Sequence, residues 1–352
     1  MPVVACVAVF YAIAVPVRLE QHGALWFVHI GSDFLSAAHT SDVIRPSLGA
    51  QNTFGYDGQY YFALAADPVH ARDYMGGNAG VVYSRAFYPA VSRGVSFGSV
   101  AALPYAMLVV NLLAVLAGTV AVALWFVKRG FTPWPALLYG LFPGLVVSSF
   151  RDLTEPLAFG LAAVAALAFD DRRRVQSDRW WSRWWRAAAF AAGTCGPLLL
   201  WRLVVTFWID QPTQEVGHER GWILPLHGIW SWWPFDRTHW LIVVAVTLPS
   251  LAAGAGALVL IRRRRCVVPA GLLLANVLLY VVWLPRAVNI DESAASRAAV
   301  GVVLAALYCL PAWWSASRAR VAVAAGALAF SIAWFLLAAA LLGVSGLHDI
   351  TT

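Results

Sequence analysis

A carboxylate among aromatic residues is the first part of the sequence that could carry out chemistry. Asp57 lies in the run Phe-Gly-Tyr-Asp-Gly-Gln-Tyr-Tyr-Phe, and an Asp held within reach of a hydroxyl group can act as a general base. Gly55 and Gly58 would let a ligand approach this carboxylate closely. We therefore predict that Asp57 is a catalytic residue, and that its neighbours bind a substrate: Tyr56, Gln59, Tyr60 and Tyr61.

A short helix over residues 57–66 would present these side chains. The aromatic residues follow Asp57 at helical spacing, and Asp67-Pro68 would close the helix. In such a helix Asp57 also fits a plain N-cap, because the free backbone N–H groups of a helix start favour a carboxylate. The catalytic and the capping interpretations of Asp57 are both open at this level.

Charged residues at three further places could contact a phosphate or complete the site. Arg85 lies in segment 83–97, whose pattern is typical of an amphipathic helix in the membrane interface. Arginine there binds either lipid headgroups in general or one particular phosphate, whose geometry it matches. The predicted substrate-binding residues outside the Asp57 run are Arg85, Tyr88, Arg151, Asp152, Glu155, Arg286 and Arg297.

The turn over residues 151–156 separates two very apolar runs. Ionisable groups at such a depth are costly unless they are paired, and they often mark a functional path. Arg151 and Glu155 have the i, i+4 spacing of a self-satisfied ion pair. A structural pair and a functional site are equally good interpretations of this turn.

Composition identifies the elements that must position these residues. Of the 352 residues, 61% are hydrophobic and 12% are charged, whereas a soluble domain has roughly a quarter of its residues charged. The chain is therefore predicted to be an all-α polytopic membrane protein with one domain over 1–352. Its net charge of +7 lies largely in short segments between apolar runs, so nucleic acid is not an implied partner. The four cysteines have no disulfide-like or zinc-like spacing.

Nine apolar runs approach the roughly 20 residues that cross a bilayer. Pro143-Gly144 within one of the runs is typical of a broken or re-entrant helix. The predicted spans are residues 2–18, 100–127, 133–150, 155–170, 187–209, 238–261, 267–285, 298–314 and 321–344.

The positions of Lys and Arg predict the orientation. Short basic loops favour the cytoplasmic side, which places the N-terminus inside and the long loop 18–99 outside the cytoplasmic membrane. The outward turns then hold nearly all of the candidate site residues. The basic residues of the predicted inner loops are Lys128, Arg129, Arg172, Arg173, Arg174, Arg179, Arg183, Arg186, Arg262, Arg263, Arg264, Arg265, Arg318 and Arg320.

Three motifs together resemble a known group of enzymes. They are Tyr56-Asp57 followed by aromatics, Phe-Tyr-Pro at 87–89 ahead of a long apolar run, and Thr-Glu-Pro-Leu-Ala at 154–158. This pattern, over about the first half of the chain, resembles the GT-C superfamily of polytopic glycosyltransferases, most closely the PIG-V-like mannosyltransferases and their actinobacterial relatives. The resemblance implies a polyprenyl-phosphate sugar donor, an essential Asp in the first outward loop and activity on the outer face. The sequence departs from it in having Tyr56 where these mannosyltransferases commonly have Trp.

The resulting hypothesis is an inverting glycosyltransferase. It would move a sugar of the mannose or arabinose class from the polyprenyl-phosphate donor to an acceptor hydroxyl of a glycan or glycolipid, with membrane lipids around it. Asp57 would be the base, Arg85 with Arg286 or Arg297 would stabilise the leaving phosphate, and the tyrosines near Asp57 would form a sugar platform. No cofactor is required, although a divalent metal is compatible with the chemistry. The alternatives are a transporter or lipid flippase, and a scaffold protein in which Asp57, Arg85 and Glu155 point apart.

Overall fold

The computed structural model describes residues 1–38, 41, 43–44, 48–175, 199–209, 226–283 and 292–316. Within these ranges every regular element is a helix, and one isolated backbone bridge joins Gly31 to Asn52. The predicted all-α class is confirmed for this part of the chain. The elements are α1 Pro2–His22, α2 Leu25–Val28, α3 Ser32–Ala37, α4 Asp57–Ala66, η2 Ala71–Asp73, η3 Gly76–Asn78, α5 Ala79–Ser84, α6 Phe87–Val95, α7 Leu103–Val127, η4 Trp134–Ala136, α8 Leu137–Gly140, α9 Pro143–Phe150, α10 Glu155–Val175, a helix over Leu199–Ile209, α12 His227–Trp230, α13 Arg237–Ile242, η5 Val243–Thr247, α14 Leu248–Arg262, α15 Val267–Leu278, η6 Leu279–Trp283, α16 Glu292–Ala298 and α17 Val300–Ala316.

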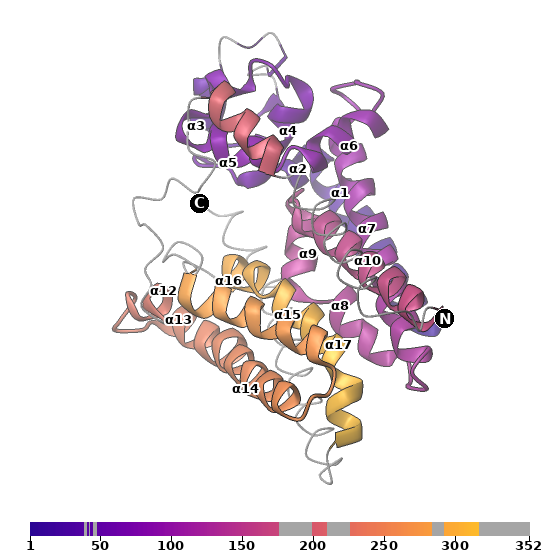
Figure 1. Ribbon diagram of the computed structural model, residues 1–352. Helices are drawn as coiled ribbons and strands as arrows, with labels where there is room; N and C mark the ends of the chain where they lie inside the picture. Colours follow the sequence, from indigo (N-terminus) through magenta and orange to yellow (C-terminus); the bar gives the residue numbers. More distant parts are fainter. Residues whose placement is uncertain are drawn as a thin grey trace.

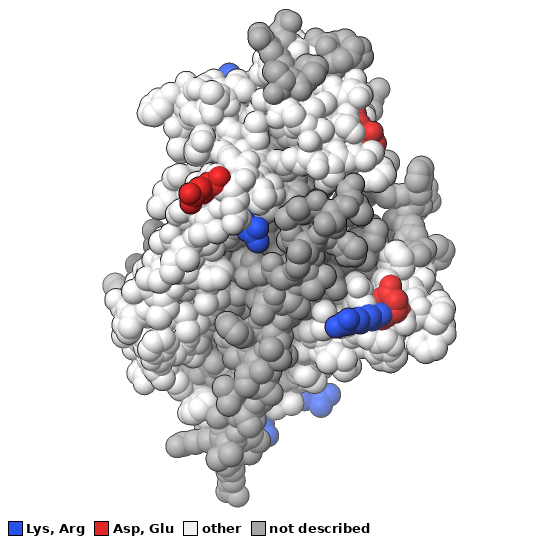
Figure 2. All heavy atoms as spheres, turned by 180° about the vertical axis from the view of Figure 1, so that it is seen from behind, with Lys and Arg blue, Asp and Glu red and all other residues white. Residues whose placement is uncertain are grey.

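Three helices are long and apolar enough to cross a membrane. They are α1, α7 and the continuous helix Arg237–Arg262, which joins α13, η5 and α14. The 25 residues of α7 correspond to about 37 Å at the helical rise, which exceeds the roughly 30 Å of a hydrocarbon core. On the face drawn in Figure 2, few charged side chains interrupt the uncharged surface. The chain is thus a helical, membrane-embedded protein.

The other predicted spans are shorter than expected or interrupted, so nine spans are not confirmed. Four runs hold apolar helices of 10 to 17 residues, which are Glu155–Ala168, Leu199–Ile209, Val267–Val281 and Val300–Trp314. The run 133–150 is divided into η4, α8 and α9, as Pro143 predicts, because proline is accepted in the first turn of a helix and breaks the one before it. The run 321–344 lies outside the described residues.

The elements of the first long loop form a compact unit of their own. Figure 1 shows α3, α4 and α5 grouped at one end of the molecule, with α6 beside the start of α7. Buried aromatic residues of this unit, such as Phe34, Phe62 and Tyr83, belong to one hydrophobic cluster with Met107 of α7. The predicted helix over 57–66 is confirmed as α4, whereas the predicted helix over 83–97 is divided into α5 and α6 at Arg85-Ala86.

Two further hydrophobic clusters hold the rest of the described chain together. One joins α1, α7, α9, α16 and α17, and the other joins α14, α15 and α17. α10 lies along α7, and no side chain separates them at Gly160, where a Cβ would meet the backbone of Ala114. This packing places the first residue of α10 beside the loop unit.

Candidate functional site

Two extended pieces of the first loop position the start of α4. The backbone N–H of Gln51 donates to the Ile30 carbonyl at 2.8 Å, and that of Tyr56 donates to the His29 carbonyl at 2.8 Å. The Gln59 amide closes the arrangement, because Oε1 accepts from Gly31 N at 2.9 Å and Nε2 donates to the Phe54 carbonyl at 3.0 Å. The backbone around Asp57 is therefore held by fixed hydrogen bonds.

Glycines in this region serve backbone packing and not the approach of a ligand. A Cβ at Gly55, whose φ is +70°, would collide with Gln59 and Gly31, and a Cβ at Gly58 would collide with the carbonyls of Arg151 and Val28. The expectation that these glycines leave room for a substrate is thus wrong. Gly58 instead lets the first turn of α4 lie against the turn that follows α9.

Asp57 is the first residue of α4, and its side chain does not cap the helix. The N-cap position belongs to Tyr56, and no side-chain hydrogen bond caps this helix. The Asp57 side chain is 49% exposed, and Oδ2 accepts a hydrogen bond from Arg297 Nη2 at 3.2 Å. The interpretation of Asp57 as a helix N-cap is therefore wrong.

Arg297 joins the two carboxylates of the site. Its side chain is 12% exposed, and it donates to Glu155 Oε1 from Nε at 3.0 Å and from Nη2 at 2.9 Å. Its Nη1 donates to the Tyr56 hydroxyl at 3.0 Å. Burial alone would lower the pKa of the Arg297 guanidinium, but Glu155, Tyr56 and Asp57 outweigh it and raise that pKa well above its usual range.

A close helix contact delivers Arg297 to this position. Gly144 of α9 lies directly against the backbone of Ser296 and Arg297, where a Cβ would collide with the Ser296 carbonyl. No sequence motif singles out Gly144 for this contact. The available signal was the Pro143-Gly144 pair, which predicts the helix break but not the partner of the glycine.

Glu155 begins α10, and its side chain is 16% exposed. Among the described residues, Glu155 accepts hydrogen bonds from Arg297 and not from Arg151, so the predicted i, i+4 pair is not formed. Arg151 lies over the Tyr56 ring instead, with its guanidinium carbon 4.2 Å from the ring centroid. The turn thus contributes one carboxylate to the site and one cation to its aromatic face.

Arg85 supplies a further positive charge. It ends α5, and its Nη1 donates to the Tyr61 hydroxyl at 3.1 Å. Its charge acts on both Tyr61 and Glu155. Burial raises the pKa of Tyr61, and the nearby Arg85 offsets this in part. Arg85 therefore faces the same charge cluster as Arg297.

Three residues predicted to bind substrate are buried in the scaffold. Gln59, Tyr61 and Tyr88 are 1%, 2% and 2% exposed. The Tyr88 hydroxyl donates to the Met107 carbonyl at 3.2 Å and accepts from Asn111 Nδ2 at 3.0 Å. The prediction of direct substrate contact is wrong for these three, because α4 and α6 pack those faces against α7. Tyr56 and Tyr60 stay half-buried, and Tyr60 packs edge-on against Phe34.

Asp152 lies beneath the site rather than in it. It is fully buried in a left-handed backbone conformation with φ of 48°, and no described residue donates a hydrogen bond to either carboxylate oxygen. Burial raises the pKa of Asp152 well above its usual range, and the nearby Tyr88 hydroxyl offsets this only in part. Asp152 is thus a buried carboxyl group in the scaffold, and burial favours its protonated form.

Comparison with known proteins adds nothing to this geometry. No family model, characterised protein or solved structure matches the chain. Of the residues predicted for the site, Arg286 lies outside the described part. No group of three or more His, Cys, Asp or Glu side chains that could hold a metal ion occurs among the described residues.

The arrangement as a whole can accept a proton next to positive charge. Asp57 Oδ1 has no hydrogen bond from the described residues, and its carboxylate is half exposed. Arg297 uses Nε and Nη2 for the two carboxylates and Nη1 for Tyr56, so it fixes the carboxylates in place. A reacting hydroxyl group could reach Asp57 from solvent without breaking this network.

Proposed function

We propose that the chain is an inverting glycosyltransferase that uses a polyprenyl-phosphate sugar as donor and an alcohol as acceptor. The observation that carries the proposal is the meeting of Asp57, Glu155 and Arg297 from α4, α10 and α16, with one carboxylate half exposed and the other largely buried. A scaffold protein that kept the motifs without a site would not need these three elements to converge. The motifs shared with the GT-C superfamily supply the substrate class.

In the proposed reaction, Asp57 acts as the general base. The acceptor hydroxyl attacks the anomeric carbon of the sugar, the bond from that carbon to the phosphate oxygen breaks, and the hydroxyl proton moves to the Asp57 carboxylate. The products are the glycosylated acceptor and the polyprenyl phosphate, which keeps the bonding electron pair. Water or a buffer base then removes the proton from Asp57.

Arginine side chains would stabilise the charge on the departing phosphate, because hydrogen bonds between ionised partners are the strong ones. Arg85 and Arg151 are the candidates in the described part, since both lie near Tyr56 or Glu155 and Arg297 is occupied by the carboxylates. Arg297 is then a positioning residue for Asp57. Tyr56 and Tyr60 are the remaining candidates for the sugar platform.

The distribution of basic residues supports a location on the outer face of the cytoplasmic membrane. Lys128 and Arg129 follow the end of α7. Arg262 ends α14, and Arg263, Arg264 and Arg265 follow it. Both helix ends lie away from the site. Retention of short basic loops in the cytoplasm would leave α4 and the starts of α10 and α16 outside. The donor and the acceptor would reach the site from that surface.

A transporter remains the second candidate from a different class. Transport sites are commonly built from polar groups near the middle of the bilayer, whereas α7 carries no Asp, Glu, Lys, Arg or His over its whole length. The proposed reaction therefore fits the described spans better than passage through them. Movement of a lipid-linked sugar across sealed vesicles, without a covalent product, would favour the transporter.

The test compares Asp57→Asn with the wild type for transfer of radiolabelled mannose or arabinose from a polyprenyl-phosphate donor in detergent micelles. We expect the rate to fall about 100-fold or more, because general bases contribute roughly 10²–10⁴. The matched control is Asp73→Asn, whose side chain is 60% exposed and, among the described residues, forms an ion pair with its neighbour Arg72 alone. Undiminished transfer by folded Asp57→Asn would remove Asp57 from the mechanism.

A further inference from the structure

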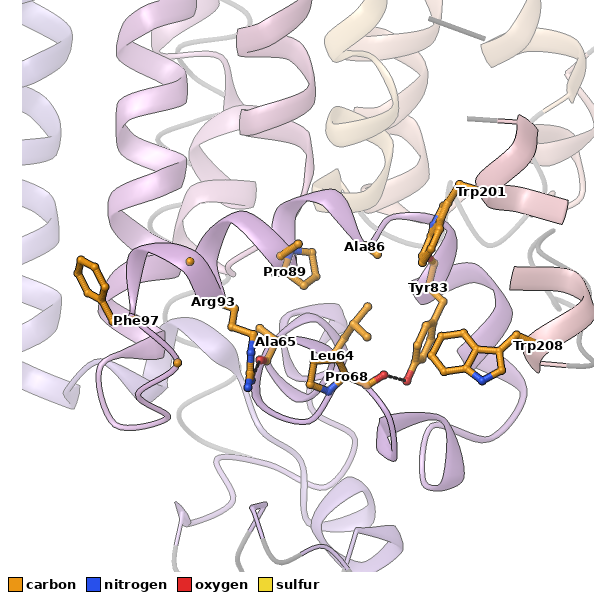
Figure 3. Close-up of a pocket in the computed structure, with 13 residues that line it drawn as sticks. Leu64, Ala65, Pro68, Tyr83, Ala86, Pro89, Arg93, Phe97, Trp201 and Trp208 are labelled. Carbon is orange, nitrogen blue, oxygen red and sulfur yellow. Dashed lines mark hydrogen bonds between the residues drawn. The ribbon is translucent and has the colours of Figure 1, made fainter. Parts of the chain in front are cut away.

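A groove lies in the loop unit, apart from the charge cluster. It is a groove of about 590 Å³ between α4, α6 and the helix Leu199–Ile209, within the range of about 300–1,000 Å³ that small-molecule sites occupy. Figure 3 shows Phe97 at one end of the groove and Trp201 and Trp208 at the other, with Arg93 of α6 pointing towards α4.

The walls of the groove present hydrocarbon and aromatic faces. Leu64 and Pro89 line it, and the polar side-chain atoms of Trp201 and Tyr83 are bonded to backbone carbonyls. Trp201 Nε1 donates to the Tyr83 carbonyl at 2.8 Å, and the Tyr83 hydroxyl donates to the Pro68 carbonyl at 2.8 Å (Figure 3). A hydrocarbon chain would therefore enter the groove without leaving a buried donor unpaired.

Among the described residues that line the groove, Arg93 is the one with a charged side chain. Its Nη1 donates to the carbonyls of Ala65 and Ala66, at 2.6 and 2.9 Å, at the end of α4. None of the described residues provides a carboxylate that pairs with Arg93. Because a guanidinium carries five N–H donors, its Nε and Nη2 remain available to an anion at the groove.

The groove is separate from the carboxylate site. Ala65 follows Asp57 by eight residues along α4, which places the Arg93 contact about 12 Å from Asp57 at the helical rise. A phosphate held on Arg93 is therefore not the phosphate that would react beside Asp57. The groove is thus a candidate lipid site in addition to the proposed donor site.

We propose that the groove binds one acyl chain of an anionic phospholipid, with the phosphate of that lipid on Arg93. Charge complementarity selects the occupant, because a cation that pairs with no described carboxylate, on the wall of an apolar groove, matches a phosphate attached to a hydrocarbon chain. The aromatic residues at both ends suit the headgroup level of a bilayer, where Trp is enriched. The inference does not depend on the proposed glycosyl transfer.

The test is lipid binding by the full chain, purified in detergent and measured by native mass spectrometry. Dioleoyl phosphatidylglycerol is titrated against dioleoyl phosphatidylcholine and against a polyprenyl monophosphate. The variants are Arg93→Gln, Arg93→Lys and Gly94→Leu. Gly94 lines the groove, and a Cβ there meets nothing within 4 Å, so the leucine fills the groove while it favours the helix. Arg18→Gln removes an arginine outside the groove as the matched control.

The wild type should bind phosphatidylglycerol more tightly than phosphatidylcholine. Arg93→Gln should weaken phosphatidylglycerol binding about tenfold or more, because it removes charge-assisted hydrogen bonds, whereas Arg93→Lys should keep most of it. Gly94→Leu should weaken both phospholipids, and Arg18→Gln neither. Equal affinity for the two phospholipids, unchanged binding by Arg93→Gln or Gly94→Leu, or a groove that takes only polyprenyl monophosphate would each overturn the proposal. Arg93 also contacts the end of α4, so Arg93→Gln could fail to fold. In that case the binding measured with Arg93→Lys and Gly94→Leu tests the proposal.

Discussion

Replacing Arg297 should show how much its two ion pairs differ in strength, because the pair with Glu155 is largely buried and the pair with Asp57 is half exposed. Arg297 is 12% exposed and Glu155 is 16% exposed, whereas Asp57 is 49% exposed. Arg297→Met would leave the Glu155 carboxylate without the partner that neutralises it. Loss of one partner of a buried pair typically costs about 3–5 kcal/mol, whereas an exposed pair contributes about 0.2–1 kcal/mol.

Double-mutant cycles measure the two pairs separately. We expect Arg297→Met to cost about 3–5 kcal/mol in the wild type, and at least about 2 kcal/mol less when Glu155→Gln is already present. The equivalent coupling between Arg297→Met and Asp57→Asn should stay below about 1 kcal/mol. The free energy of unfolding in detergent micelles, followed by tryptophan fluorescence, gives both values.

A different order of the couplings would refute the reasoning. If Arg297 couples to Glu155 by less than about 0.5 kcal/mol, burial does not make this pair strong. If the coupling to Asp57 is the larger one, Asp57 is the structural partner of Arg297 and loses its role as an available base. Transfer activity measured on the same variants distinguishes a folded protein in which Asp57 is misplaced from a protein that has unfolded.

The remaining predictions concern the scaffold around the site. Gly144→Ala should lower the free energy of unfolding by about 1–3 kcal/mol and reduce transfer activity, because its Cβ would displace the backbone of α16; Gly271→Ala, where a Cβ meets nothing within 4 Å, is the control that should do neither. Burial raises the pKa of Asp152, so the folded protein keeps a proton that the unfolded chain loses near pH 4. The wild type should therefore lose up to about 1.4 kcal/mol of stability per pH unit between pH 4 and that raised pKa. Unfolding measured at several pH values should show no such contribution in Asp152→Asn, and a parallel slope in both proteins would contradict the assignment. Tyr61→Phe should lower transfer activity with little change in the free energy of unfolding, because it removes only the hydroxyl that accepts a hydrogen bond from Arg85 at 3.1 Å. Unchanged kinetics would show that Arg85 does not need this hydrogen bond.

Local features of the site followed from the sequence because their causes are local. Asp67-Pro68 predicted where α4 ends, and Pro143 predicted the break before α9. The turn that carries Glu155 was likewise predicted between two apolar runs. Proline and helix-end chemistry act within a few residues, so their effect is visible without the fold.

Exposure within α4 and α6 did not follow from the sequence. Gln59, Tyr61 and Tyr88 were expected to contact a substrate, but all three are buried. The segment 57–66 has apolar or aromatic residues on most of its circumference, so the pattern does not say which face meets α7. Only the position of α4 between α6 and α7 decided that Tyr60 stays partly accessible.

The amino-acid sequence by itself determined the class of the protein and the short-range course of its chain. Composition requires a membrane-embedded helical protein, and glycine, proline and capping residues limit where its helices begin and end. The tertiary structure decided which charges meet. Arg297 reaches Glu155 across 142 residues because Gly144 and Gly58 let backbones touch, and because the largely buried Glu155 carboxylate requires a cation nearby. Contacts of this kind depend on the packing of several helices at once, which no single stretch of sequence contains.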